Sequence, residues 1–348
     1  MQSKDFIIVG SGLAACIVAH QLHQEGKSFT IISNPQLSSS SRVAAGICNP
    51  VVFFRITKSY MVDLALPYAA GFYRDIESKL GIACWSDMPL VKLFADAREM
   101  ELWEKRREEG VGSYLGETLG PIAGIHATVG GGMVRKSARM DGAAFLDATA
   151  AFFTSDFQNQ TFEYDRLKIE ATGVIYNNAI QASGIIFCEG HCVVNNPWFG
   201  NVAMKPVKGD VLTVRFAEAL PVSVRDFIVT RSCFLMPLGE LTYKAGATYN
   251  WEVLNDVPEE SGRAHIEAQI RSITDVPFEV IHHEAGVRPA SADRRPVLGT
   301  HPEHNALHIF NGLGTKGMML GPYFGNMLVQ HLLRGQKILK EVDVKRFF

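Results

Sequence analysis

The sequence lacks the features that mark several large classes of protein. Its 34 Lys and Arg nearly balance its 36 Asp and Glu, and a formal net charge of −2 argues against a polyanion-binding surface. The six cysteines are scattered, and the nearest pair, Cys188 and Cys192, has no histidines at metal-ligand spacing. No run of about 18 apolar residues is present to span a membrane. We therefore expect a cytoplasmic protein with free thiols, no metal and no nucleic-acid partner.

The first apolar stretch is instead typical of a nucleotide-binding turn. Residues 6–19 lack a convincing signal-peptide cleavage site. Residues 6–9 predict a buried parallel strand, and residues 13–22 predict a helix. The glycines between them permit a tight turn and close approach of a pyrophosphate, which the helix N-terminus favours. A purely structural turn is the alternative. The residues predicted to hold the pyrophosphate are Gly10, Gly12, Leu13, Ala14 and Ala15.

The second strand departs from the pattern of NAD-binding proteins. Residues 28–32 predict a buried strand, at whose end an acidic residue is expected to bind the ribose. Ser33 and Asn34 stand there instead, and each offers only neutral hydrogen bonds. This weakens the case for NAD and leaves the adenosine contact open.

The middle of the chain predicts a change of architecture. Residues 60–80 have helical spacing, with a kink or a split expected at Pro67. Residues 205–283 read as strands and hairpins, including a strand at 224–229, with one helix that begins at Ser261. This pattern indicates a separate antiparallel sheet inserted between pieces of the nucleotide-binding domain.

A second strand, glycine turn and helix appear near the end of the chain. Residues 307–310 predict a buried strand, and the glycine-rich segment 311–322 opens a helix that runs to about residue 333. Two helix N-termini of this kind require two negative centres. A pyrophosphate supplies one, and a reduced flavin ring, negative around N1 and O2, is one candidate for the other.

Taken together, these segments resemble the D-amino-acid oxidase / glycine oxidase superfamily of FAD-dependent oxidoreductases over nearly the whole chain. The motifs that carry the resemblance are GSGLAA at 10–15, SRVAAGICNP at 41–50, FCEG at 187–190, KPVKGDVLTV at 205–214, GVRP and RRPVLG within 286–299, and GLGTKGMMLGP at 312–322. The resemblance implies an α/β fold, with a Rossmann-like FAD-binding domain and a mainly antiparallel substrate domain. We expect the FAD domain to comprise residues 1–81, 136–204 and 285–348, and the substrate domain residues 82–135 and 205–284.

The resemblance also assigns residues to the cofactor. The segment from Ser41 to Gly46 would run along the flavin, and the turn from Gly314 to Met318 would place amides beside N1 and O2. FAD is expected to be non-covalent, because members with a covalent link use positions other than Cys48. Beyond the residues of the first turn, those implied are Ser33, Asn34, Ser41, Arg42, Ala44, Ala45, Gly46, Gly190, Gly314, Thr315, Lys316, Gly317 and Met318.

Three residues are implied on the substrate side. Arg288 would bind a substrate carboxylate through its planar guanidinium, with a structural salt bridge as the alternative. Tyr249 would supply the hydroxyl that relatives often carry at the position of Phe234, although a surface tyrosine is equally consistent. Lys316 would add positive charge near the flavin, or is a solvated lysine at a helix start.

The implied function is oxidation of a C–N bond of a small amine or amino acid by hydride transfer to flavin N5. Electrons would pass to O2 or to another acceptor, and the chain would function alone or as a homo-oligomer. Two alternatives stay open: a flavin enzyme that modifies the wobble uridine of tRNA, and a non-catalytic FAD-binding subunit of a dehydrogenase complex.

Overall fold

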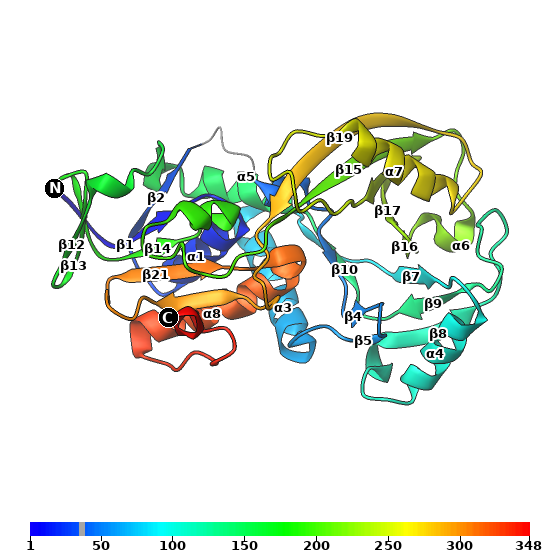
Figure 1. Ribbon diagram of the computed structural model, residues 1–348, viewed down its shortest axis with the longest axis horizontal. Coiled ribbons are helices and arrows are strands. Elements are labelled where there is room, and N and C mark those ends of the chain that lie inside the picture. Colours follow the sequence, from blue (N-terminus) through cyan, green and yellow to red (C-terminus); the bar gives the residue numbers. More distant parts are fainter. Residues whose placement is uncertain (35–38) are drawn as a thin grey trace.

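Two β-sheets lie side by side in the computed structural model, which describes residues 1–34 and 39–348 (Figure 1). Both chain termini belong to the half that contains the first sheet, and the second sheet fills the other half. The predicted α/β architecture with a second, mainly antiparallel sheet is confirmed.

The first sheet has a parallel centre built from the predicted buried strands. Its order is β11-β2-β1-β14-β13-β12, and β21 pairs with both β14 and β20. The central strands are apolar and buried on both faces, as parallel strands covered by helices require. Asn177 and Asn178, both with positive φ, form the turn between β13 and β14. Its strands are β1 (Gln2–Val9), β2 (Phe29–Ser33), β11 (Phe157–Asn159), β12 (Leu167–Glu170), β13 (Gly173–Tyr176), β14 (Ile180–Phe187), β20 (Val297–Thr300) and β21 (Leu307–Asn311).

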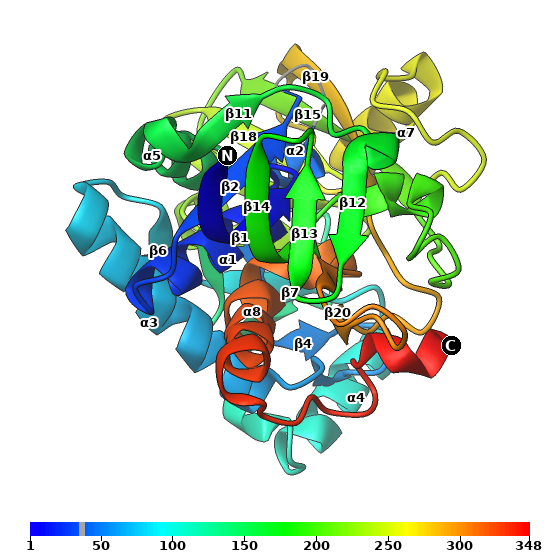
Figure 2. The ribbon, with the colours of Figure 1, turned by 90° about the vertical axis from the view of Figure 1, so that its left-hand side faces the viewer.

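Helices pack against this sheet and against one another (Figure 2). They are α1 (Leu13–Gln24), α3 (Val62–Leu80), α5 (Gly142–Phe152) and α8 (Gly317–Arg334). Asp141 caps α5 as predicted, because its side chain accepts a hydrogen bond from the backbone N–H of Ala144. A kink or a split was expected at Pro67, and the split is wrong: α3 is one helix with Pro67 inside it, and Gly81 ends it in the left-handed conformation.

The second sheet is antiparallel except where β7 runs parallel to β16. Its order is β19-β15-β18-β17-β16-β7-β9-β8. The strand expected at 224–229 is partly wrong, since its first half forms the short helix α6 (Val222–Arg225) after Pro221. The strands are β7 (Leu90–Leu93), β8 (Leu115–Leu119), β9 (Gly131–Val134), β15 (Val207–Phe216), β16 (Ile228–Thr230), β17 (Phe234–Gly239), β18 (Thr242–Gly246) and β19 (Phe278–Arg288), with α4 (Ala97–Arg107) and α7 (Glu260–Arg271) beside them.

Short elements connect the two halves. The 3-10 turn η5 (Gly314–Lys316) leads directly into α8. The others used below are α2 (Ser40–Val43), β3 (Ile47–Cys48), β4 (Val51–Val52), β5 (Thr57–Lys58), β6 (Trp85–Asp87), β10 (Ala138–Met140), and η4 (Gly190–Asn195).

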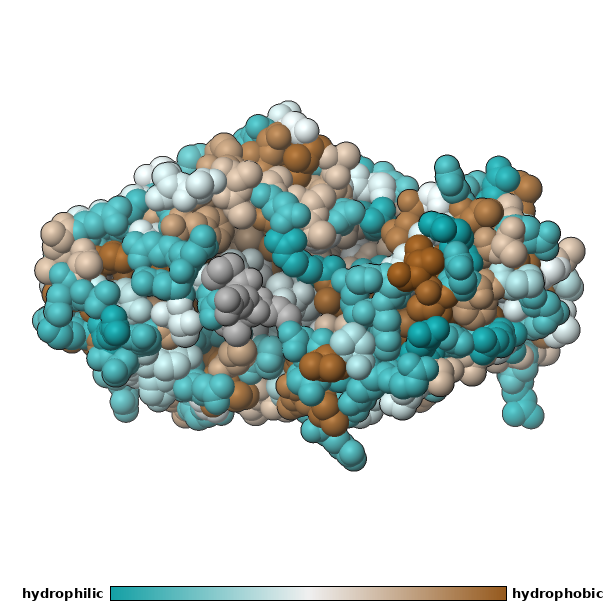
Figure 3. Space-filling model, turned by 90° about the horizontal axis from the view of Figure 1, so that it is seen from above, coloured by the Kyte–Doolittle hydropathy of each residue, from teal (hydrophilic) through white to brown (hydrophobic). Residues whose placement is uncertain are grey.

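The predicted domain boundaries stay a prediction. Strand β19 crosses the boundary expected between residues 284 and 285, and it pairs along its whole length with β15. Among the described helices, none is both long and apolar enough to cross a membrane. Seen from above, apolar residues form separate patches in a largely hydrophilic face (Figure 3). Ser38, part of the serine run before residue 41, lies outside the described residues.

Candidate active site

A cavity of about 740 Å³ extends from the turn after β1 to the strands of the second sheet. Turns from both halves of the chain line it: the β1–α1 turn, α2, the start of η4, and η5 with the start of α8. Of the residues that the sequence assigned to cofactor or substrate, all but Ala15 and Arg42 line this cavity. The predicted segments therefore meet at one place although they lie far apart in the chain.

The turn before α1 is shaped for close approach. Gly10 has a φ of +106°, and a methyl group there would lie 2.5 Å from the carbonyl oxygen of Cys188. Gly12 precedes α1, and no side chain caps that helix through it. The backbone N–H of Leu13 donates to Ser41 Oγ at 3.2 Å, which joins α1 to the segment predicted to follow the flavin. This helix N-terminus faces the cavity with its positive end.

Ala15 and Arg42 do not line the cavity. Ala15 is fully buried in the core around α1. Its small side chain lets the helix pack closely against the strand, which is the role of the third small residue in the dinucleotide fingerprint. The side chain of Arg42 pairs with Asp147 at the surface. Neither side chain is therefore placed to contact a cofactor in this cavity.

The far end of the cavity holds polar groups that the sequence reading identified only in part. Ser33 Oγ lies 2.8 Å from Ser11 Oγ, and Asn34 Nδ2 donates to Thr161 Oγ1 at 3.0 Å. Glu189 was quoted within the FCEG motif but given no role. Its carboxylate accepts hydrogen bonds from Tyr164 Oη at 2.5 Å and from Asn196 Nδ2 at 2.8 Å, and burial raises its pKa.

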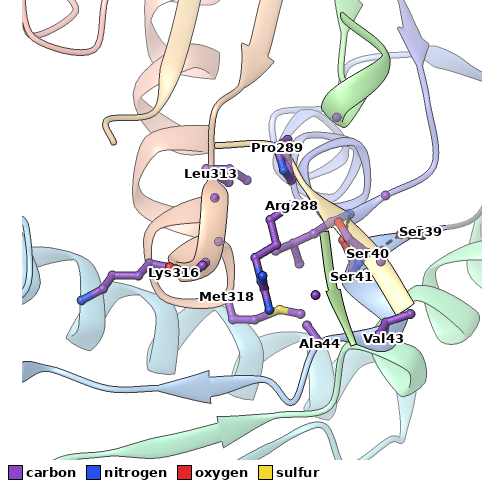
Figure 4. Close-up of a pocket in the computed structure, with 18 of the residues that line it drawn as sticks. Ser39, Ser40, Ser41, Val43, Ala44, Arg288, Pro289, Leu313, Lys316 and Met318 are labelled. Carbon is purple, nitrogen blue, oxygen red and sulfur yellow. Dashed lines mark hydrogen bonds between the residues drawn. The ribbon is translucent and has the colours of Figure 1, made fainter. Parts of the chain in front are cut away.

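The start of α8 supplies the second helix N-terminus at the cavity. Gly312 and Gly314 adopt positive φ, which turns the chain from β21 into η5. No side chain caps α8, and no acidic residue stands in its first turn. Lys316 donates to Ser59 Oγ, and burial lowers the pKa of its ammonium to about 8. Its side chain points away from Arg288, so η5 presents backbone rather than this charge to that part of the cavity (Figure 4).

The segment from Ser41 to Gly46 passes beside Arg288 on the opposite side from η5 (Figure 4). Gly46 has a φ of +77°, and a methyl group there would overlap the carbonyl oxygen of Met140. The segment therefore packs tightly against β10. Cys48 is buried and does not line the cavity, whereas the cavity-lining cysteines are Cys188, Cys192 and Cys233.

Arg288, at the end of β19, is mostly buried and has no acidic partner within 4.0 Å among the described residues. Its Nη1 donates to the carbonyl oxygens of Thr248 at 3.2 Å and Lys208 at 3.5 Å. The guanidinium stacks on Tyr249, with 4.7 Å from its carbon to the ring centroid. Burial lowers its pKa. The salt-bridge alternative is thus unsupported among the described residues. Asp210 attracts the guanidinium from a distance without pairing with it, and a mostly buried cation faces the cavity.

Tyr249 is placed by a loop whose anchor the sequence reading missed. Its ring is half exposed and stacks on Trp251, with centroids 6.0 Å apart. The buried carboxylate of Asp210 accepts from Thr248 Oγ1 at 3.0 Å and from the backbone N–H of Glu259 at 3.0 Å. Asp210 therefore ties both ends of the loop 248–259 to β15. Its presence in KPVKGDVLTV was visible, but its partners are distant in sequence.

The chemistry of the cavity suits an elongated ligand that carries negative charge at two places. Two uncapped helix N-termini favour negative charge at two places, and the glycine turns leave backbone exposed to a ligand. A methyl group on Gly190 would meet nothing within 4 Å, so the backbone there borders open space. A dinucleotide that contains a flavin fits these features, and the fold and the site thus fit the class of flavin-dependent oxidoreductases.

The family follows from comparison of the sequence. Residues 5–331 match the family model for FAD-dependent oxidoreductases, DAO, and the chain belongs to this family. It is accordingly an FAD-dependent enzyme.

The relatives cover the chain almost completely. A glycine oxidase of Bacillus licheniformis is 24% identical over 94% of this chain and 93% of its own length. The tRNA 5-methylaminomethyl-2-thiouridine biosynthesis bifunctional protein MnmC of Acinetobacter baylyi is 24% identical over 99% of this chain and 57% of its own. The solved structure of a glycine oxidase from Geobacillus kaustophilus has a TM-score of 0.82 at 20% identity, covering 100% of this chain and 98% of that one. Such a structural likeness shows the fold alone.

Proposed function

We propose that this enzyme oxidises the C–N bond of a small amine that carries a carboxylate. The observation that carries the proposal is Arg288, a buried guanidinium without an acidic partner among the described residues. An unpaired buried charge is costly, and a bound carboxylate removes that cost through charge-assisted hydrogen bonds. FAD, when bound, supplies the acceptor for a hydride from the carbon that bears the amine.

The residues of this chain act by position and by charge. Arg288 holds the carboxylate, while the carbonyl of Thr248 and the ring of Tyr249 fix the plane of the guanidinium. The N-terminus of α8 stabilises negative charge that develops nearby, because its amides and dipole are preorganised. This chemistry requires no strong general base if the amine binds in its neutral form.

The cofactor assignments follow the same reasoning. The turn of Gly10, Gly12, Leu13 and Ala14 would hold the pyrophosphate, with Ser33 and Asn34 at the adenosine end. The segment from Ser41 to Gly46 and the turn from Gly314 to Met318 would flank the flavin. Tyr249 acts through Arg288 rather than as a proton donor, since its ring packs on the guanidinium.

The match to MnmC keeps tRNA modification as the competing function. The formal net charge of −2 disfavours it, because tRNA phosphates are gripped by clustered Lys and Arg. An enzyme for free amino acids needs one cation for its substrate, and Arg288 provides it.

An anaerobic reduction experiment tests the proposal. The FAD-loaded protein is mixed with amino acids and N-methyl amino acids, and bleaching of the flavin absorbance is followed. Replacing Arg288 with Leu is expected to raise KM for the reducing amino acid by about 100-fold, given the 2–5 kcal/mol typical of a broken buried charge pair. FAD content and the spectrum of the oxidised protein should stay unchanged.

Matched variants make this result specific. Arg288→Lys keeps the charge but loses the pair of N–H donors that binds a carboxylate through both oxygens. Its affinity for the substrate is expected to lie between those of the wild type and Arg288→Leu. Arg98→Leu removes an exposed arginine on α4 and should leave KM unchanged. Equal KM values in the wild type and Arg288→Leu would contradict the role of Arg288, and reduction by modified tRNA alone would favour the competing function.

A further inference from the structure

The second sheet presents one row of cross-strand neighbours to the cavity. Val211 pairs with Gly246, Gly246 with Phe234, and Phe234 with Thr230. Directly opposed residues lie on the same face of a sheet, and all four line the cavity. Ile228 lies two residues before Thr230 on this face.

Two glycines in this face make room for two large side chains. A methyl group on Gly209 would lie 2.1 Å from Nη2 of Arg288, so the guanidinium rests directly over Gly209. A methyl group on Gly246 would lie 3.5 Å from Cζ of Phe234, so the phenyl ring borders Gly246. Gly209 is diagonal to Gly246 across β15 and β18, and such pairs are about 7–8 Å apart. The cation and the ring thus bracket a space suited to one small amino acid.

Charge is distributed very unevenly over this face. Among the described strand residues that this sheet contributes to the cavity, Arg288 alone is charged. The neighbours beyond it are apolar or small: Leu90, Val211, Ile228, Thr230 and Phe234. A second carboxylate on the substrate would find no second cation here, and a side-chain ammonium would find no acid. Either group would be desolvated without a partner, which is unfavourable.

We propose that the substrate is a mono-carboxylate amino or imino acid with an apolar side chain, which packs against Phe234, and that Phe234 sets this preference. The proposal rests on the proposed function, since it places the carboxylate on Arg288. The phenyl ring of Phe234 carries no polar group, so it offers contact area and no hydrogen bond. A pocket that contacts each added methylene discriminates by roughly 10–200-fold per group.

The test compares kcat/KM across substrates that differ only in the side chain. The FAD-loaded wild type is assayed with glycine and with both enantiomers of leucine, methionine, phenylalanine, glutamate and lysine. We expect the best apolar amino acid to exceed glycine, glutamate and lysine by at least about 10-fold. Phe234→Ala should lower kcat/KM for that amino acid by about 10-fold and change kcat/KM for glycine by less than about two-fold.

Further variants separate specificity from folding. Phe234→Leu retains an apolar side chain and should keep the order of substrates if Phe234→Ala folds poorly. Phe234→Tyr adds a hydroxyl and should narrow the difference between apolar and polar side chains. Phe152→Ala removes a half-exposed phenyl ring from α5 and should change no substrate ratio.

Three outcomes overturn the proposal in distinguishable ways. Oxidation of glutamate or lysine as fast as the best apolar amino acid refutes the substrate class while leaving the proposed function intact. An equal loss for glycine and for the apolar substrate in Phe234→Ala refutes the role of Phe234. Failure of every amino acid to reduce the bound FAD refutes the proposed function and this inference with it.

Discussion

At the scale of single residues, the position of Arg288 depends on the absence of a side chain at Gly209. The guanidinium lies where a β-carbon of residue 209 would stand. The carbonyl oxygen of Thr248 accepts its hydrogen bond, and the ring of Tyr249 packs on its face. The charge of Arg288 was foreseen from sequence, but the requirement for Gly209 was not. That requirement arises from the register of β15 against β19, which pairs Gly209 with Gly286.

Gly209→Ala is therefore expected to displace Arg288 without removing it. The added methyl group would lie 2.1 Å from Nη2, far inside contact distance, and the guanidinium at the end of a flexible side chain must shift. A shift of this kind is expected to lower kcat/KM for the carboxylate substrate by about 100-fold. Steady-state kinetics and flavin content measure the effect, and Gly71→Ala, where a methyl group meets nothing within 4 Å, is the control. An unaltered kcat/KM in Gly209→Ala would show that Arg288 does not need its present place.

At the scale of elements, the two glycines of the β1–α1 turn have different roles: one is required by the fold and the other by the cofactor. Gly10 and Gly12 both belong to the dinucleotide fingerprint, yet the structure treats them differently. Gly10 needs a positive φ and contacts the backbone of Cys188. Gly12 has an ordinary φ of −76°, and a methyl group on it would come no closer than 3.6 Å to any protein atom, that atom being Ser39 Oγ.

The two glycines should consequently give opposite phenotypes. Gly12→Ala is expected to preserve the thermal stability of the FAD-free protein and to weaken FAD binding by at least about 10-fold, since the methyl group occupies the approach to the helix N-terminus. Gly10→Ala is expected to destabilise the fold by about 2 kcal/mol or more. Calorimetry of the FAD-free protein and fluorescence titration with FAD report on the two effects. Normal FAD affinity in Gly12→Ala would contradict the assigned pyrophosphate site.

The elements also show how far the sequence determines the structure. Strand, glycine turn and helix are local patterns, so α1, β21 and the end of α8 were predicted to within about two residues, although β1 begins four residues before the predicted strand. A kink or a split was expected at Pro67, but α3 is not split, because Pro67 removes one backbone hydrogen bond while the apolar face of α3 packs on α8. The contacts of Asp210 with the loop 248–259 were not predictable, because no local pattern records a hydrogen bond between residues 38 or 49 positions apart.

At the scale of the whole molecule, two buried histidines make stability depend on pH. Burial lowers the pKa of His20 to about 4 and that of His308 to about 3. His20 Nε2 lies 2.9 Å from Thr149 Oγ1, whose proton goes to the carbonyl oxygen of Phe145, so His20 is the donor in its neutral form. Below pH 6.5 the unfolded chain binds these protons and the folded protein does not. The folded protein therefore loses stability as the pH falls from 6.5 toward the lowered pKa values of the two histidines.

Acidification from pH 6.5 to 5 is expected to cost the fold about 2 kcal/mol per histidine. Urea-unfolding midpoints across this pH range measure the loss. His20→Gln keeps a donor to Thr149 but cannot take up a proton, and should reduce the loss of stability on acidification by about the 2 kcal/mol that His20 contributes. A wild type equally stable at pH 5 and pH 6.5 would contradict the assignment of neutral buried histidines.

The order of strands in the first sheet has a consequence for how the enzyme is made in the cell. Strand β1 pairs with β14, and β14 pairs with β21, so neighbours in space come from the start, middle and end of the chain. During translation the ribosome releases β1 and α1 first, long before η5 and α8 exist to close the other side of the cavity. A nascent chain thus holds half of its FAD site with exposed edges on β1. The FAD site is therefore complete only once η5 and α8 have folded against β1 and α1.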